Sequence, residues 1–251
     1  MAWRKTTWLN NREHIDKMNI DAITHYFTRT SDLVDLTHPL HTGMPTWPSH
    51  PMFCQEVLES FDTGHISCNH ALAMSEHTGT HFDAPQHFLP DGAGIDSISM
   101  QTFFGRMVVI KQSNATPGQA IGLTCLKEFE QTYGSVEEGD AVFFHFGWDR
   151  FWNDPPENSR FLRDWPGLSR EVAEALVERK VRIVGTDCLS IDAFPSQDFP
   201  AHKVLLGAGI LVGENFARLG EIPDFSFLVT LPLPIRNGSG SPLRAIASFN
   251  R

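Results

Sequence analysis

One stretch of the chain alternates short apolar runs with a helical pattern, and it constrains the fold more than any other feature. Residues 141–146 (AVFFHF) and 181–184 (VRIV) are apolar runs of strand length, typical of strands buried on both faces. Between them, Ser169 can cap a helix that places Val172 and Leu176 on one face. A strand, a helix and a second buried strand in this order predict a βαβ unit with parallel strands.

Further strand-like segments precede and follow this unit. They are residues 33–40, 68–74, 106–111, 210–213, 227–233 and 245–249. Thr124 can cap a second helix that runs to Tyr133, with Gly134 in the position after it. Strands dominate, with a few helices packed outside, and no linker composition divides the chain. We predict an α/β fold with a single domain at residues 31–251, preceded by an arm or surface helix at residues 1–30.

The composition excludes several classes of protein. The 251 residues are 41% hydrophobic and 20% charged, which is ordinary for a globular chain and argues against disorder. Twenty basic against thirty acidic residues give a net charge of −10, which disfavours nucleic-acid binding. No apolar run approaches the ~18 residues of a membrane span, and the start lacks the apolar core of a secretory signal. With four scattered cysteines and no C-x-x-C pair, we expect a cytoplasmic protein without a disulfide framework.

Residues 76–88 (EHTGTHFDAPQHF) concentrate the groups that could bind a metal ion. A glycine and a proline in this segment discourage a helix, and on an extended backbone His81 and Asp83 point the same way. A turn just before them could fold His77 back beside them. Two neutral imidazoles and one carboxylate form an open ligand set for Zn²⁺ or Mn²⁺, with a position left for water. His87, beyond the proline, could be a further ligand or a proton-transfer group.

Two later residues extend the candidate site. His202 begins a short helical run, and Glu214 ends the apolar strand at residues 210–213. A carboxylate at the end of a buried strand is costly unless it is paired or bound to a metal ion. Each residue alone also fits a purely structural role. Together with the first cluster they could complete a second site, in which Asp83 bridges two ions.

The pattern His77-x-Gly-Thr-His81-x-Asp83-Ala-Pro-x-His87 resembles the signature of the putative cyclase superfamily, which includes bacterial kynurenine formamidases and isatin hydrolases. Weaker similarities extend from Leu33 to the C-terminus in the expected order. They are DLT at 35–37, MPTWP at 44–48, GTD at 185–187, SID at 190–192 and GSPLRA at 240–245. The resemblance implies a swivelling β/β/α fold, often assembled as a homodimer or homotetramer.

The resemblance also implies metal ligands. His77, His81 and Asp83 match ligands of a first ion. His202 and Glu214 would hold a second ion, as in the kynurenine formamidase branch. The isatin hydrolase branch is similar at the metal motif and the GSGSPLR ending, but is described with a single manganese ion. One or two Zn²⁺ ions are therefore expected, with Mn²⁺ as the alternative.

The implied activity is metal-dependent hydrolysis of a small-molecule amide. The first expectation is an aryl formamide such as N-formylkynurenine, attacked by metal-bound hydroxide. His87 matches the family's catalytic acid/base and would protonate the leaving group. The alternative is ring opening of isatin or another cyclic amide or lactone, and some family members cyclise or dehydrate. A metal-stabilised module without turnover is a different class, and the spare imidazole of His87 argues against it.

Aromatic residues near these motifs are candidates for a substrate-binding wall. Trp47 and Phe88 are the first candidates because both lie beside motif residues. Phe53 and Phe194 are secondary candidates, and each of the four could instead be a plain core aromatic. Flat apolar walls would suit an aniline, an indole or another aromatic ring.

Overall fold

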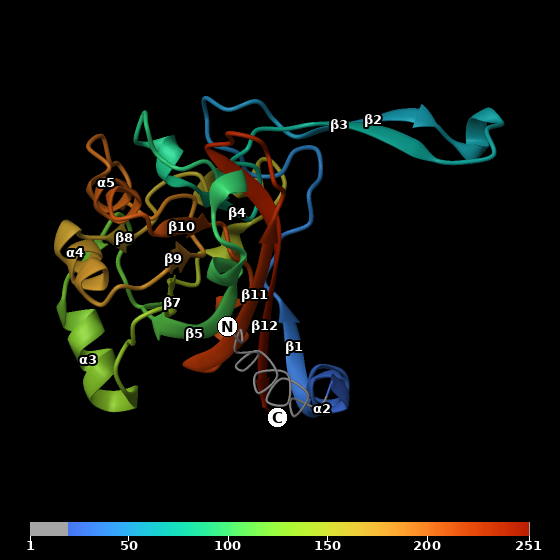
Figure 1. Cartoon of the computed structure of the whole chain (residues 1–251). Coiled ribbons are helices and arrows are strands. Elements are labelled where there is room, and N and C mark those ends of the chain that lie inside the picture. The colour runs from blue at the N-terminus through green and yellow to red at the C-terminus, as the bar shows by residue number, and fades with distance from the viewer. Residues whose placement is uncertain (1–19, 251) are drawn as a thin grey trace, which may run out of the picture.

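The computed structural model describes residues 20–250, and a strand-rich sheet forms its centre (Figure 1). The eight strands of this sheet are β1 (Ser31–Asp35), β4 (His81–Asp83), β5 (Phe104–Lys111), β7 (Ala141–His145), β9 (Ile183–Thr186), β10 (Leu211–Glu214), β11 (Phe225–Pro232) and β12 (Gly240–Asn250). They lie in the order β1-β12-β11-β5-β7-β9-β10-β4, and β4 also pairs with β12, so the sheet closes on itself. The predicted α/β fold with a strand-rich core and few outer helices is confirmed.

Four neighbouring strands, β5, β7, β9 and β10, run parallel. The helices on one side of them in Figure 1 are α3 (Thr124–Tyr133), α4 (Arg170–Glu178) and α5 (Pro200–Gly207). Because α4 lies between β7 and β9 in the chain, the predicted βαβ unit is present. Ser169 caps α4 as predicted, since its hydroxyl accepts a hydrogen bond from the N–H of Val172. The predicted Thr124 cap is wrong: Thr124 is already in the first turn of α3, and the residue before it, Leu123, has no side-chain oxygen to accept a bond.

Two apolar clusters pack on the sheet. One lies against the helices and includes a leucine from each of them: Leu126, Leu176 and Leu205. The other lies on the opposite face and includes Phe82, Phe143 and Phe216. Successive side chains of a strand point to opposite faces, so Phe143 joins the second cluster and Phe144 the first. The continuous apolar run of β7 thus reflects a strand that is buried on both faces.

A two-stranded hairpin arm projects away from the closed sheet (Figure 1). It consists of β2 (Cys54–Glu59) and β3 (Asn69–Ala73), with the one-turn helix η2 (Phe61–Thr63) at its tip. The segment at 68–74 therefore contains a strand, as predicted, but this strand lies outside the main sheet. Short elements complete the fold: β6 (Ala120–Ile121), β8 (Gly167–Leu168), η3 (Pro85–His87), η4 (Ile95–Ser97), η5 (Met100–Phe103), η6 (Asp149–Phe151), η7 (Glu157–Arg160) and η8 (Leu219–Glu221).

The predicted N-terminal arm or surface helix falls mostly on residues 1–19, which lie outside the described residues. Its remainder forms α2 (Ile20–His25) and the π-helix η1 (Tyr26–Thr30), followed directly by β1. Within residues 20–250, no helix is long and apolar enough to cross a membrane.

Candidate active site and metal centre

The short strand β4 places the central ligands of the candidate site. It is antiparallel to β10, with His81 opposite Glu214 and Asp83 opposite Val212. Residues directly opposite in an antiparallel pair share a face, so Glu214 lies beside His81 and Asp83. Phe82 between them points to the other face and is fully buried in the core. This register joins the two candidate clusters of the sequence into one site.

His202 reaches the same site from the first turn of α5. Its Nε2 atom lies 3.2 Å from Oδ2 of Asp83 and 3.1 Å from Oε1 of Glu214. Its Nδ1 atom lies 2.6 Å from Oδ2 of Asp192, whose carboxylate also accepts a hydrogen bond from the backbone N–H of Ala201. A carboxylate partner at Nδ1 fixes the proton there, so Nε2 presents its lone pair to the site.

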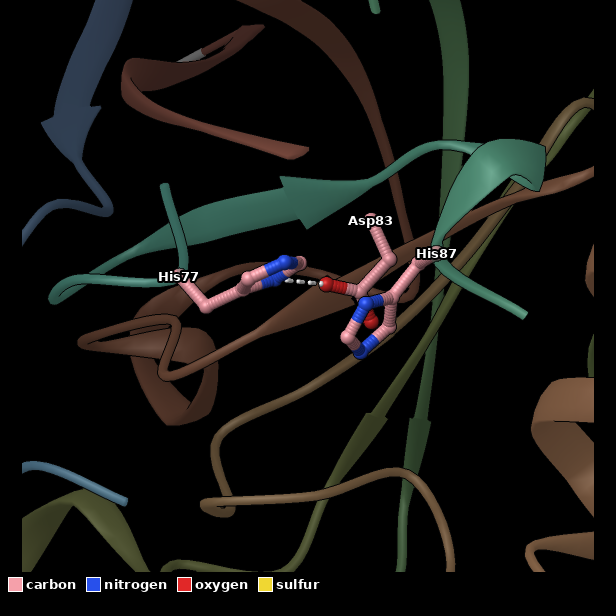
Figure 2. A group of neighbouring side chains, drawn as sticks. All are labelled: His77, Asp83 and His87. Atoms are coloured by element: carbon pink, nitrogen blue, oxygen red, sulfur yellow. Dashed lines mark hydrogen bonds and ion pairs between the residues drawn. The ribbon is translucent and has the colours of Figure 1, made fainter. Parts of the chain in front are cut away.

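His77 reaches the site because the chain turns just after it. Gly79 has φ +63°, a left-handed conformation that glycine adopts at little cost, and the chain bends at residues 79–80. The Nδ1 atom of His77 lies 2.6 Å from Oδ1 of Asp83, as Figure 2 shows. Its Nε2 atom lies 3.0 Å from the hydroxyl of Ser239, which itself donates to Glu76. The Nε2–H group therefore donates to Ser239, and Nδ1 faces Asp83 with a lone pair.

His81 has the same arrangement. Its Nδ1–H donates to the carbonyl of Gly79 over 2.8 Å, and the side-chain amide of Asn215 donates to the same carbonyl over 2.9 Å. Its Nε2 atom lies 3.4 Å from Oδ1 of Asp83 and 3.7 Å from Oε2 of Glu214. Because the Gly79 carbonyl holds the proton on Nδ1, the lone pair on Nε2 of His81 faces the carboxylates of Asp83 and Glu214.

These donor atoms form a buried, electron-rich cluster that fits one or more cations. Lone pairs of three imidazoles converge on the carboxylates of Asp83 and Glu214, and the ligand atoms of His81, Asp83 and Glu214 lie within 4.8 Å of one another. Facing lone pairs at such distances repel unless protons or metal ions lie between them. Imidazole and carboxylate are the donors that Zn²⁺ and Mn²⁺ accept. The side chains present therefore suit a metal centre.

Without a bound ion, the imidazoles that face the carboxylates bind protons more readily than usual. Burial disfavours charge on His81 and His202, but hydrogen bonds and charge from the surrounding carboxylates raise the pKa of both imidazoles. Burial would raise the pKa of Asp83, yet the neighbouring imidazoles, His77 foremost, hold it well below its usual range. Burial lowers the pKa of His87 to about 4, so this imidazole is neutral at physiological pH. His87 therefore differs in protonation from His81 and His202.

His87 stands at the edge of this cluster. It ends η3, and its ring lies 4.0 Å from the ring of His77 and 6.3 Å from that of His202, centroid to centroid. One ligand atom each from His77, Asp83 and His87 also falls within 4.8 Å of the others (Figure 2). The geometry is therefore open to either role expected for His87, ligand or proton-transfer group.

A cavity of about 220 Å³ opens above the cluster. Trp47 and Phe88 line it together with the candidate ligands and His87. Phe53 and Phe194, the secondary candidates, do not line it: Phe53 is buried elsewhere, and Phe194 packs edge-on against Trp165 at 4.9 Å. Phe199 lines it instead, from the residue before α5.

Several residues of the site escaped the sequence-based prediction. Asp192 lies in a motif noted only for its resemblance, and neither Asn215 nor Ser239 was singled out. His50 lines the cavity, with its ring 5.8 Å from that of His77. The sequence around a residue in a loop or after a strand does not reveal such contacts, because each contact depends on which distant segments the fold brings together.

Comparisons with known proteins give a family match, similar curated proteins and similar solved structures. Residues 34–193 match the family described as putative cyclase, a span that includes His77 to His87. The chain is 30% identical to a kynurenine formamidase of Bacillus cereus, over 87% of this chain and 98% of the relative. It is 31% identical to the Bacillus anthracis kynurenine formamidase with the same coverage. Among solved structures, isatin hydrolase A from Labrenzia aggregata, bound to benzyl benzoate, superimposes with a TM-score of 0.84 and 29% identity, over 92% of this chain and 99% of that one. Isatin hydrolase A from Ralstonia solanacearum gives 0.81 and 27%, with both chains fully covered.

Proposed function

The chain belongs to the putative cyclase family, and on that premise we propose that it is a metal-dependent hydrolase of small amides, acting on C–N bonds other than peptide bonds. The observation that carries the proposal is the convergence of imidazole lone pairs on two buried carboxylates at the floor of a cavity. A purely structural metal site is closed by its ligands. Here the ligand cluster faces a cavity with His87 at its edge, so a substrate could reach it.

The metal would be held by residues at the cavity floor. They are His77, His81, Asp83, His202 and Glu214. Asp83 turns Oδ1 to His77 and His81 and Oδ2 to His202, so one carboxylate could serve one ion or bridge two. We propose Zn²⁺, with Mn²⁺ as the alternative. When bound, such an ion polarises a carbonyl oxygen and lowers the pKa of water towards ~7.

Proton transfer and substrate binding would be carried out by residues of the chain itself. His87 is neutral at physiological pH, so its imidazole can accept the proton of the attacking water and deliver it to the departing nitrogen. This role requires that His87 does not itself bind the metal. Trp47, Phe88 and Phe199 form apolar walls that would hold a flat ring and exclude water.

The proposed substrate is an aryl formamide, with N-formylkynurenine as the leading example. Kynurenine formamidases align with nearly their whole length at about 30% identity. Ring opening of a cyclic amide is the second candidate, because the isatin hydrolase of Labrenzia aggregata shares the whole fold at 29% identity. Both reactions cleave a C–N bond next to an aromatic ring. Each therefore suits the aromatic walls of the cavity.

Two further expectations accompany this function. We propose a homo-oligomer, a homodimer or homotetramer, and a location in the cytoplasm. The two exposed cysteines, Cys54 and Cys68, and the two buried ones, Cys125 and Cys188, are all unpaired, which suits a reducing compartment.

Turnover of N-formylkynurenine and of isatin, measured side by side, tests the proposal. Activity should disappear on chelation, return with added metal, and be lost in His81→Ala. His25→Ala, which changes an exposed histidine on α2, is the matched control and should keep full activity. A preference for isatin would assign the second candidate function. A folded, metal-loaded protein that cleaves neither substrate would contradict both.

A further inference from the structure

His50 is a polar residue of the cavity to which the proposed reaction gives no role. It lines the cavity, and its ring centre lies 5.8 Å from that of His77. Its Nδ1 atom is buried and has no hydrogen-bond partner within residues 20–250. A buried polar atom without a partner costs free energy. Because this atom belongs to a residue of the cavity wall, a bound substrate could supply the missing partner.

A tight turn holds His50 beside the aromatic wall. The backbone N–H of His50 donates to the carbonyl of Trp47 over 2.9 Å, which closes a β-turn with Pro48 in its second position. Proline is favoured there because its ring already fixes the φ that the turn requires. Trp47 and His50 therefore line the cavity from the two ends of one turn. A flat ring that lies against Trp47 can thus present a substituent to His50.

The charges around the cavity restrict what the partner of His50 can be. Among the described residues that line the cavity there is no lysine or arginine, and the carboxylates of Asp83 and Glu214 are present. A carboxylate group of a substrate would find neither of these cations to pair with. An uncharged acceptor, such as a carbonyl oxygen, does not need one. Imidazole can carry its proton on either nitrogen, so Nδ1–H of His50 can donate to such an oxygen.

Both candidate substrates carry a second carbonyl group close to the scissile amide. In N-formylkynurenine and in isatin, a ketone is attached to the ring carbon next to the one that bears the amide nitrogen. When the amide C–N bond breaks, its electron pair moves to the nitrogen and, through the ring, partly to the ketone oxygen. A hydrogen bond to this oxygen therefore strengthens as the bond breaks, which is the condition for an interaction to accelerate a reaction.

We propose that Nδ1–H of His50 donates a hydrogen bond to this ketone oxygen, so that the enzyme selects anilides with a carbonyl group ortho to the amide nitrogen. With the scissile carbonyl at the ligand cluster, the 5.8 Å between the rings of His50 and His77 suits a substituent close to the scissile bond. Water adds to the amide carbon, the C–N bond breaks, and the nitrogen takes the proton that His87 has accepted from the water. His50 keeps its own proton. This inference rests on the proposed function and names its substrate class.

Two formanilides separate the contact with His50 from the electronic effect of a ketone. In 2′-formamidoacetophenone the ketone is ortho to the nitrogen, and in 4′-formamidoacetophenone the same ketone is para and points away from the scissile bond. Each kcat/KM is divided by the rate constant for hydrolysis of the same compound by hydroxide alone, which corrects for intrinsic reactivity. The wild type should prefer the ortho compound by about tenfold or more, the usual effect of one hydrogen bond to a developing charge.

Substitutions of His50 test whether this residue causes the preference. His50→Ala cannot donate and should abolish most of the preference, whereas His50→Gln has a donor amide and should recover part of it. His41→Ala is the matched control: it changes a histidine of the same loop that contacts Asp154, does not line the cavity, and should keep the wild-type preference. Because the preference is a ratio of two rates of one sample, it does not depend on the fraction of the protein that holds metal.

The outcomes separate this inference from the proposed function. Equal hydrolysis of the two formanilides by the wild type, or an unchanged preference in His50→Ala, would overturn the inference and leave amide hydrolysis intact. If isatin is cleaved but neither formanilide is, His50→Ala should lower kcat/KM for isatin about tenfold relative to His41→Ala, and an unchanged value would overturn the inference. A folded, metal-loaded protein that cleaves none of these compounds would contradict the proposed function and this inference with it.

Discussion

The Nε2 atom of His202 lies 3.2 Å from Oδ2 of Asp83, although 119 residues separate them in the chain. The other oxygen of Asp83 lies 2.6 Å from Nδ1 of His77. One oxygen of Asp83 thus faces His202 on α5, and the other faces His77 in the segment before β4. A carboxylate placed in this way can bind one ion with either oxygen or bridge two ions. The contact with His202 depends on the second nitrogen of that ring, which Asp192 holds.

Asp192→Asn should weaken metal binding by about 10–100-fold, the usual cost of losing a carboxylate behind a ligating histidine. The amide could offer its NH₂ group to Nδ1 of His202 and so reverse the ring's tautomer. The dissociation constant, measured by competition with a chelator, checks this. Asp198→Asn is the control, because Asp198 is exposed on the same segment. Equal affinities in the two variants would show that Asp192 does not orient His202.

His87→Ala should reduce kcat by about 10²–10⁴ and leave the metal content unchanged, because the lost group moves a proton. Metal analysis of the purified variant and steady-state kinetics give the two values. Loss of metal along with activity would instead assign His87 to the ligand group that it forms with His77 and Asp83 in Figure 2. The same pair of measurements therefore decides between the two roles that the geometry permits.

Metal binding at pH 7 should release protons, and the apparent affinity should rise between pH 6 and pH 8. The surrounding carboxylates outweigh burial and raise the pKa of His81 and His202 in the metal-free chain, so these rings hold protons that the metal must displace. Calorimetry in buffers of different ionisation enthalpy counts the protons. His202→Ala should release fewer. An affinity independent of pH over this range would contradict the prediction.

Local patterns were sufficient to predict much of the fold. The cap at Ser169 and the candidate ligands between His77 and Asp83 depend on residues within a few positions of one another, and each segment of the βαβ unit has its own local hydrophobic pattern. The expectation that His202 and Glu214 join the site came from the resemblance to the cyclase family. Local spacing could not place them, because Glu214 comes to lie opposite His81 only through the pairing of β4 with β10.

The remainder depends on distant contacts. The strand at 68–74 resembles a core strand in sequence, yet it lies in the hairpin arm because β2 is its sole partner within the described sheet pairings. Phe194 lies two residues after the SID motif at 190–192, but its ring packs on Trp165 instead of lining the cavity. Phe199 enters the cavity because α5 begins beside it. Loop side chains acquire such neighbours only in the folded chain.

Trp47→Ala should raise KM for aromatic substrates about tenfold with little change in kcat, because a lost aromatic wall removes apolar contact area rather than a reacting group. Phe194→Ala is the matched control: it removes an aromatic ring of the same cluster that does not line the cavity. Steady-state kinetics with N-formylkynurenine or isatin provides the comparison. An unchanged KM in Trp47→Ala would remove Trp47 from the substrate-binding wall.

Asp187 should make the protein less stable as the pH rises towards neutrality. Burial raises the pKa of this fully buried carboxyl from 3.8 to about 7, although backbone N–H groups of Phe146 and Trp148 bond to it. Between about pH 4 and pH 7 the folded chain keeps a proton that the unfolded chain releases, so the free energy of unfolding falls by at most about 1.4 kcal/mol per pH unit. Asp187→Asn removes this titration. Urea unfolding of metal-loaded wild type and variant at pH 5 and pH 7.5 should therefore show a larger loss in the wild type, and parallel losses would mean that Asp187 is ionised throughout.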